Sequence, residues 1–177
     1  MSTPDVKSRF HSRRDAGRQL SQHVARLVKG DRVTVVALQP GGIPIGYEVA
    51  RLLHAPLELL RRDGRPLPAL TGRTVVLVDD GLATTSTMHE AVKRVRELGA
   101  ARIIVAAPIS SPDASAIIRA EADDCTCVIS HFPLHGVQEW YDDFAQPSDD
   151  EVLTLLAANT SWIANRTNAA LEPELTW

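Results

Sequence analysis

The sequence predicts an α/β fold, in which a doubly wound parallel sheet carries helices on both of its faces. Short apolar runs rich in β-branched residues recur along the chain, as expected for strands that are covered on both sides. Segments with apolar residues at helical spacing lie between these runs. The length of 177 residues suits one core. We therefore expect a single domain over residues 1–158 and a C-terminal tail over residues 159–177.

The expected strands are short apolar runs bounded by turn residues, such as VTVVAL and TVVLV. QPGG at residues 39–42 predicts a tight turn after the first of them. Residues 61–73 hold two prolines and two glycines and predict a connection. The expected strands span residues 33–38, 57–60, 75–78, 103–107 and 125–129.

The expected helices have recognisable ends. Gly30 and Gly99 follow the first and third helices, where glycine favours termination, and Pro112 falls in the first turn of the fourth. SDDE at residues 148–151 gives the last helix a capping serine with a glutamate three residues later. No clear pattern continues beyond about Asn159, so we expect a loosely docked tail. The expected helices span residues 15–29, 43–53, 87–98, 112–121 and 148–158.

Two adjacent aspartates, Asp79 and Asp80, come directly after the apolar run TVVLV. In an open α/β sheet, ligands bind outside the carboxyl ends of the strands, near the point where strand order reverses. A carboxylate there accepts hydrogen bonds from the vicinal hydroxyls of a sugar and helps to hold hydrated Mg²⁺. A capping or turn role before a helix is the alternative for this pair.

A hydroxyl-rich loop follows the aspartates and leads into a helix. Backbone N–H groups at a helix start point at one spot, and the helix dipole favours an anion there. An ordinary cap at Ser86 or Thr87 would explain the hydroxyls without a ligand. The order of carboxylates and then loop predicts a pocket for a ribose that carries a phosphate. The loop consists of Ala83, Thr84, Thr85, Ser86 and Thr87.

DDGLATTSTM at residues 79–88 resembles the ribose-phosphate motif of the type I phosphoribosyltransferases, and adenine-salvage members carry similar loops. Three further segments are similar to a bacterial group of that family: FHSRRDAGRQLSQHVARL, GGIPIGYEVARLLHAPLELL and WYDDFAQPSDDEV. The resemblance covers roughly residues 9–155 and leaves the acceptor base open.

The resemblance implies a transferase that binds phosphoribosyl pyrophosphate and Mg²⁺. Asp79 and Asp80 would be the catalytic pair, contacting the ribose hydroxyls and the metal, and residues 83–87 would hold the 5′-phosphate. Gln39, Gly41 and Gly42 would bind pyrophosphate through backbone amides, although a plain tight turn explains the two glycines equally well. A nitrogenous base would displace pyrophosphate from C1 of the ribose. Family members commonly pair as homodimers.

Three departures from the family pattern weaken the expectation of turnover. Gln39 stands where relatives carry a basic residue, and Thr85 replaces a glycine, so its Cβ is expected to crowd the phosphate unless φ is negative. Residues 61–73 are too short to hold the usual mobile lid. The alternative is a non-catalytic regulatory module that binds phosphoribosyl pyrophosphate or a nucleotide. Substitute cations near the diphosphate would be Arg61, Arg62, Arg65 and Arg73.

Two other groups of residues are weaker candidates for a site. Cysteines and histidines at 125, 127, 131 and 135 have poor spacing for a metal site and are expected to be core and loop residues. Four aromatic residues beyond the last strand either close the core or offer one ring to a nucleobase. They are Phe132, Trp140, Tyr141 and Phe144.

The composition argues against nucleic acid and membranes as binding partners. A formal net charge of −3 gives no basic excess for nucleic acid, and no apolar run approaches the ~20 residues of a membrane span. The first twenty residues lack the apolar core of a signal peptide, and only two cysteines occur. A small-molecule partner in the reducing cytoplasm is therefore expected.

Overall fold

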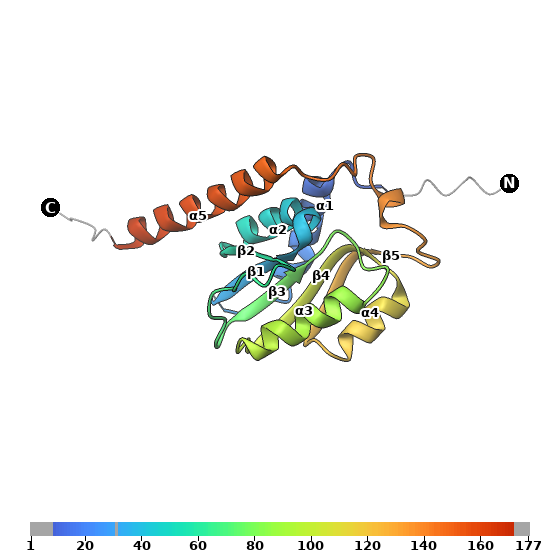
Figure 1. Ribbon diagram of the computed structural model, residues 1–177, viewed down its shortest axis with the longest axis horizontal. Coiled ribbons are helices and arrows are strands. Elements are labelled where there is room, and N and C mark those ends of the chain that lie inside the picture. The colour runs from blue at the N-terminus through green and yellow to red at the C-terminus, as the bar shows by residue number, and fades with distance from the viewer. Residues whose placement is uncertain (1–8, 31, 172–177) are drawn as a thin grey trace.

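The computed structural model describes residues 9–30 and 32–171, and a parallel sheet of five strands lies at its centre (Figure 1). The strands are hydrogen-bonded in the order β2-β1-β3-β4-β5, and every neighbouring pair is parallel. The predicted fold class is confirmed. The strands are β1 (Val33–Leu38), β2 (Leu57–Leu60), β3 (Thr74–Val78), β4 (Arg102–Ser110) and β5 (Asp124–Ser130).

Helices cover both faces of the sheet (Figure 1). Alternate residues of β3 show why: Val76 and Val78 pack with α1, α2 and α5, whereas Val75 and Leu77 pack with α3 and α4. The three central strands, β1, β3 and β4, are buried on both sides, which explains their mainly apolar sequences, whereas the edge strands β2 and β5 are partly exposed. The helices are α1 (Arg13–Ala25), α2 (Gln39–Leu53), α3 (Ser86–Glu97), α4 (Pro112–Arg119), the 3-10 turn η1 (Val137–Trp140) and α5 (Asp149–Leu171).

The strand order reverses between β1 and β3, because the chain passes from β1 outward to β2 and then returns to the other side of β1. At such a switch point the connections leaving the two strands separate and leave a crevice at the carboxyl edge. The segments that follow β1 and β3 begin with Gln39 and Asp79. The fold therefore brings the QPGG and DDGLATTST segments to the same edge of the sheet.

The first two helices differ from the sequence prediction. Helix α1 spans 13–25 rather than 15–29, because the Ser12 side chain caps it by accepting from the Asp15 amide; Gly30 lies outside it. Helix α2 begins at Gln39 rather than Ile43, so QPGG forms its first turn and not a separate turn. Pro40 is tolerated there since the first N–H groups of a helix need no intrahelical partner.

The last helix is longer than predicted. It was expected to end at 158, but α5 continues to Leu171, so the expected start of the tail falls inside a helix. Asn159 is buried and binds the edge of β2: it accepts from the Leu57 amide at 2.8 Å and donates to the Ala55 carbonyl at 3.1 Å. Beyond it, α5 extends away from the sheet (Figure 1). The last part of the predicted tail, 172–177, lies outside the described residues.

Within residues 9–30 and 32–171, no helix is both long enough and apolar enough to cross a membrane.

Candidate functional site

Asp79 and Asp80 lie at the carboxyl end of β3, where the sequence placed them. The Asp80 amide donates to Asp79 Oδ1 at 2.9 Å. Burial, reinforced by the neighbouring Asp80 charge, raises the pKa of Asp79 from 3.8 to about 7, although the Asp80 amide and Arg13 oppose the shift. An acid held this far from its ordinary pKa in a crevice is typical of functional sites.

Arg13 of α1 is a residue that the motif analysis did not single out. It is only 4% exposed, and its Nε and Nη2 atoms donate to Asp80 Oδ2 at 3.3 and 3.0 Å. The ion pair joins residues 67 positions apart in the chain, so no local sequence pattern predicts it. The only signal was the RRDAG segment within the quoted family resemblance.

The first turn of α2 packs directly against the acidic pair. A Cβ added to Gly41 would lie 2.7 Å from Asp80 Oδ2, and one added to Gly42 would lie 2.9 Å from the Val78 carbonyl oxygen. Only glycine allows this approach. Gln39, which is exposed, has φ +58°, a left-handed conformation that costs a non-glycine residue free energy and concentrates at functional sites.

The loop after the aspartates is fixed to β4. Leu82 donates its amide to the Ile109 carbonyl at 2.8 Å and accepts at its own carbonyl from the Ser111 amide at 3.2 Å. Thr85 is the N-cap of α3 but makes no side-chain capping bond, so the ordinary capping explanation of these hydroxyls does not hold. Its φ of −106° also removes the expected crowding, because this conformation needs no glycine.

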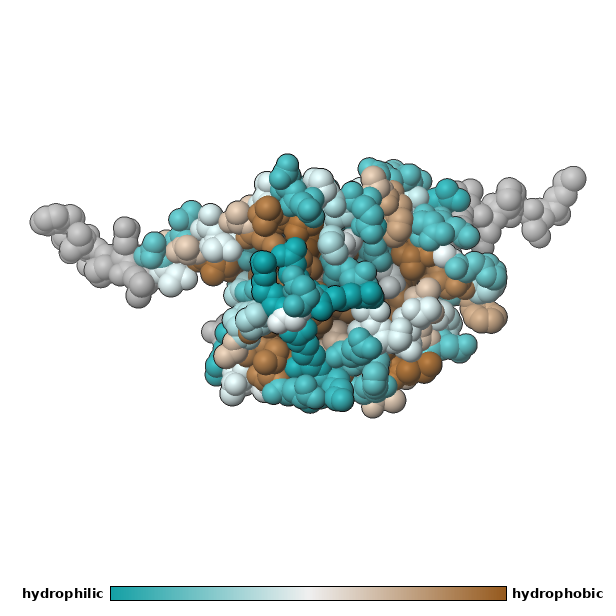
Figure 2. Space-filling model, viewed as in Figure 1, coloured by the Kyte–Doolittle hydropathy of each residue, from teal (hydrophilic) through white to brown (hydrophobic). Residues whose placement is uncertain are grey.

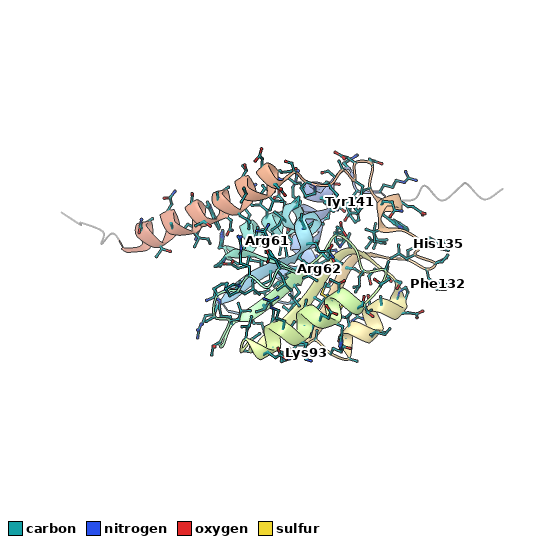
Figure 3. The ribbon with its side chains drawn as sticks, in the orientation of Figure 1. Arg61, Arg62, Lys93, Phe132, His135 and Tyr141 are labelled. Atoms are coloured by element: carbon teal, nitrogen blue, oxygen red, sulfur yellow. The ribbon has the colours of Figure 1, made fainter. Side chains whose placement is uncertain are left out.

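A cleft of about 490 Å³ opens between the starts of α2 and α3. We call it the arginine cleft, because Arg61, Arg62 and Arg94 line it together with a single acidic residue, Glu90. In Figure 2 hydrophilic side chains gather at the centre of this face, where Figure 3 labels Arg61 and Arg62 above α3. The other lining residues are Leu38, Gln39, Leu60, Ser86, Thr87 and Ala91.

Two of the four predicted substitute cations are elsewhere. Arg73 lies at the opposite edge of the sheet, where it donates to Thr34 Oγ1 and the Val33 carbonyl at 2.7 Å each, because it precedes β3 rather than following it. Arg65 does not line the arginine cleft, although its carbonyl accepts from Arg94 at 3.2 Å. The expectation that Arg73 lies near the diphosphate is therefore wrong.

A second cleft, of about 300 Å³, lies on the other side of the hydroxyl loop. We call it the Phe132 cleft; Ala83, Thr84 and Thr85 form one wall, and the 71% exposed ring of Phe132 lies on the opposite side. Figure 3 places Phe132 near the edge of the molecule, away from Tyr141. Trp140 and Tyr141 are buried in the core, so these two rings belong to core closure and not to a base site.

Comparison with known proteins identifies the family. Residues 10–143 match the profile described as phosphoribosyl transferase domain. The chain belongs to this family. An adenine phosphoribosyltransferase of Pseudomonas aeruginosa (strain PAO1) is 30% identical over 132 residues, covering 62% of this chain and 72% of that protein.

Longer relatives agree with the assignment, and a solved structure shares the fold. Two Mycobacterium tuberculosis proteins named as phosphoribosyl transferases, from strains CDC 1551 and H37Rv, are 30% identical and match 94% of this chain. The chain spans about half, 51%, of their length. The Thermus thermophilus protein TT1426 superposes with a TM-score of 0.76 at 27% identity, covering 85% of this chain and 98% of that one.

The acidic pair of this phosphoribosyl transferase domain is suited to a metal that the substrate helps to hold. Among the described residues, no three His, Cys, Asp or Glu side chains come together as a metal cage. Mg²⁺ is commonly held by one or two carboxylates together with substrate phosphates, and the adjacent Asp79 and Asp80 fit that pattern. A cation would also offset the cost of burying the Asp79 charge.

Proposed function

We propose that this phosphoribosyl transferase domain binds phosphoribosyl pyrophosphate with Mg²⁺ and transfers the phosphoribosyl group to a nitrogenous base, releasing pyrophosphate. The observation that carries the proposal is the meeting of three parts at the switch point of the sheet: the acidic pair, the hydroxyl loop and the arginine cleft. Each part has the chemistry of one portion of this substrate.

The substrate would extend across the carboxyl edge. Asp79 and Asp80 accept hydrogen bonds from the ribose hydroxyls, and the amides and hydroxyls of residues 83–87 receive the 5′-phosphate at the start of α3. The diphosphate lies in the arginine cleft, which Gln39, Arg61 and Arg62 line. Gly41 and Gly42, the predicted amide donors, follow Gln39 in the same turn but are buried and do not line this cleft. Gln39 contributes a hydrogen bond but no charge.

In the transfer step the bond between C1 of the ribose and the diphosphate oxygen breaks, the base nitrogen forms a bond to C1, and the proton that this nitrogen carried passes to solvent. Arg61 and Arg62 stabilise the negative charge that develops on the departing diphosphate. The acidic pair orients the ribose and stabilises positive charge on the ring at the transition state. Mg²⁺, when bound, neutralises diphosphate oxygens and so improves the leaving group.

The acceptor base would approach from the Phe132 cleft. The exposed Phe132 ring provides a stacking surface across from the loop that holds the 5′-phosphate, and Leu134 adds apolar area beside it. The polar side chains at this cleft are Thr84 and Thr85 of the loop and Ser111 and Asp113 at the start of α4. A flat heteroaromatic base fits these surroundings better than a charged acceptor.

A regulatory module that binds the same ligand without turnover is the second candidate, and the short 61–73 connection favours it. The alignments with the Mycobacterium tuberculosis relatives run over 226 positions, yet 94% of 177 residues can fill only about three quarters of them. These relatives therefore carry residues inside the matched region that have no counterpart here. A missing lid would leave bound substrate open to water.

Thermal unfolding with and without Mg²⁺ and phosphoribosyl pyrophosphate tests the proposal. Ligand at 100 times its Kd stabilises the folded state by about 2.7 kcal/mol. For a chain of this size that corresponds to a rise of about 5–10 °C in Tm. We expect this rise in the wild type and its loss in Asp79→Asn/Asp80→Asn.

A second pair of adjacent aspartates provides the matched control. Asp149 and Asp150 are exposed in the first turn of α5, so Asp149→Asn/Asp150→Asn removes the same charge elsewhere and should keep the ligand-induced rise. No rise in the wild type would overturn the proposed ligand. A rise without pyrophosphate release, across a panel of purine and pyrimidine bases, would favour the regulatory module.

A further inference from the structure

Arg13 connects three segments around Asp80. Besides its two bonds to Asp80 Oδ2, it donates through Nη1 to the Ala145 carbonyl at 2.6 Å, and its guanidinium lies 3.9 Å from the centroid of the Phe144 ring. All three guanidinium nitrogens are therefore used. The fork geometry of arginine allows this, whereas a lysine ammonium presents a single point of charge.

Tyr141 fixes Asp80 from the main-chain side. Its hydroxyl donates to the Asp80 carbonyl at 2.6 Å, and its ring packs against Phe10 and Phe144. Burial raises the pKa of Tyr141 far above its ordinary value, so the hydroxyl remains a donor. Both the carboxylate and the backbone of Asp80 are thus held by buried groups.

The geometry leaves one side of Asp80 for a ligand. Arg13 occupies Oδ2, and no described residue donates a hydrogen bond to Oδ1. The side chain is 21% exposed, although its partner is almost fully buried. The same Oδ2 atom also abuts Gly41, so the ion pair sets the spacing between the acidic pair and the first turn of α2.

Stability alone does not account for such a pair. Removing two charges from water costs about as much as their attraction returns, and apolar replacements are often as stable or more so. The role of the ion pair is then to orient the Asp80 side chain. We propose that Arg13, together with Tyr141, is a positioning residue that fixes Asp80 for the ribose and diphosphate of the substrate; this inference rests on the proposed function.

Calorimetric titration with Mg²⁺ and phosphoribosyl pyrophosphate tests the inference in the full chain, below the Tm of each variant. Arg13→Met should raise Kd by about 10–100-fold, the range found when outer partners of ligating groups are removed. Arg13→Lys should give an intermediate Kd, because it restores the charge but not the fork. Tyr141→Phe, which preserves the ring packing, should raise Kd several-fold.

The neighbouring arginine provides the control. Arg14 also forms an ion pair, with the buried Glu48, but it lies away from Asp80, so Arg14→Met should bind with the wild-type Kd. A merely structural Arg13 would lower Tm and leave Kd unchanged. Wild-type Kd in any folded Arg13 variant and in Tyr141→Phe would overturn the inference, whereas absence of binding by the wild type would overturn the proposed function instead.

Discussion

At the scale of single residues, the two adjacent carboxylates have different surroundings. Arg13 neutralises Asp80, whereas Asp79 is half-buried, has no cationic partner of its own among the described residues, and has its pKa raised to about 7. Burying that charge lowers the stability of the folded state. Sites built to bind charged or polar ligands commonly carry such a cost in the free protein.

Asp79→Asn should therefore stabilise the free protein at alkaline pH. Between 3.8 and about 7 the unfolded chain releases a proton that folded Asp79 keeps, so the wild-type stability falls as pH rises through this window. Asparagine does not titrate. Urea unfolding should show a more stable variant at about pH 8, with the difference shrinking toward about pH 4.

An exposed aspartate provides the contrast for that measurement. Asp150 lies in the first turn of α5, where a negative charge interacts favourably with the helix dipole, so Asp150→Asn should lose a little stability at about pH 8 rather than gain it. A wild type that stays as stable as Asp79→Asn from acid to alkaline pH would contradict the burial argument.

At the scale of elements, Asn159 decides how α5 docks. Its side chain pairs a backbone amide and a backbone carbonyl beside β2, both buried by the helix. Asn159→Ala should lower the free energy of unfolding by about 1–3 kcal/mol, because the Leu57 amide is left unpaired. Denaturant unfolding of Asn165→Ala, an exposed asparagine on the same helix, should match the wild type.

Equal losses in the two asparagine variants would contradict the role of the bonds to residues 55 and 57, because Asn165 makes neither bond and alanine favours a helix more than asparagine does. The same helix marks a limit of sequence reasoning. The Ser148 cap was predicted and is present, since Glu151 donates its amide to Ser148 Oγ at 3.1 Å. The extension to Leu171 was not predicted because its residues are mostly exposed, so the sequence shows no apolar stripe at helical spacing there.

At the scale of the whole molecule, local sequence patterns were sufficient to predict the sheet and the helix layers on its two faces. They were not sufficient to predict the contacts between these layers. Strand runs such as VTVVAL predicted β1 because a strand covered on both faces needs no polar residue. The switch point then brought Gln39 and Asp79 together. The left-handed conformation of Gln39 and the Arg13–Asp80 pair could not be predicted from the sequence, because tertiary packing imposes both.

The 61–73 connection forms one wall of the arginine cleft and is tied to α3. Arg94 donates to the carbonyls of Arg61 and Arg65, at 3.4 and 3.2 Å. A segment held in this way is poorly suited to fold over the substrate, so water should reach C1 of the ribose during turnover.

Product analysis distinguishes an open site from a closed one. With Mg²⁺, phosphoribosyl pyrophosphate and an accepted base, we expect ribose 5-phosphate to accumulate beside the nucleotide, because water and the base compete at C1. Both products should disappear in Asp79→Asn/Asp80→Asn. Nucleotide without ribose 5-phosphate would show that the cleft closes during the reaction, through movement of residues 61–73 or through a second copy of the chain.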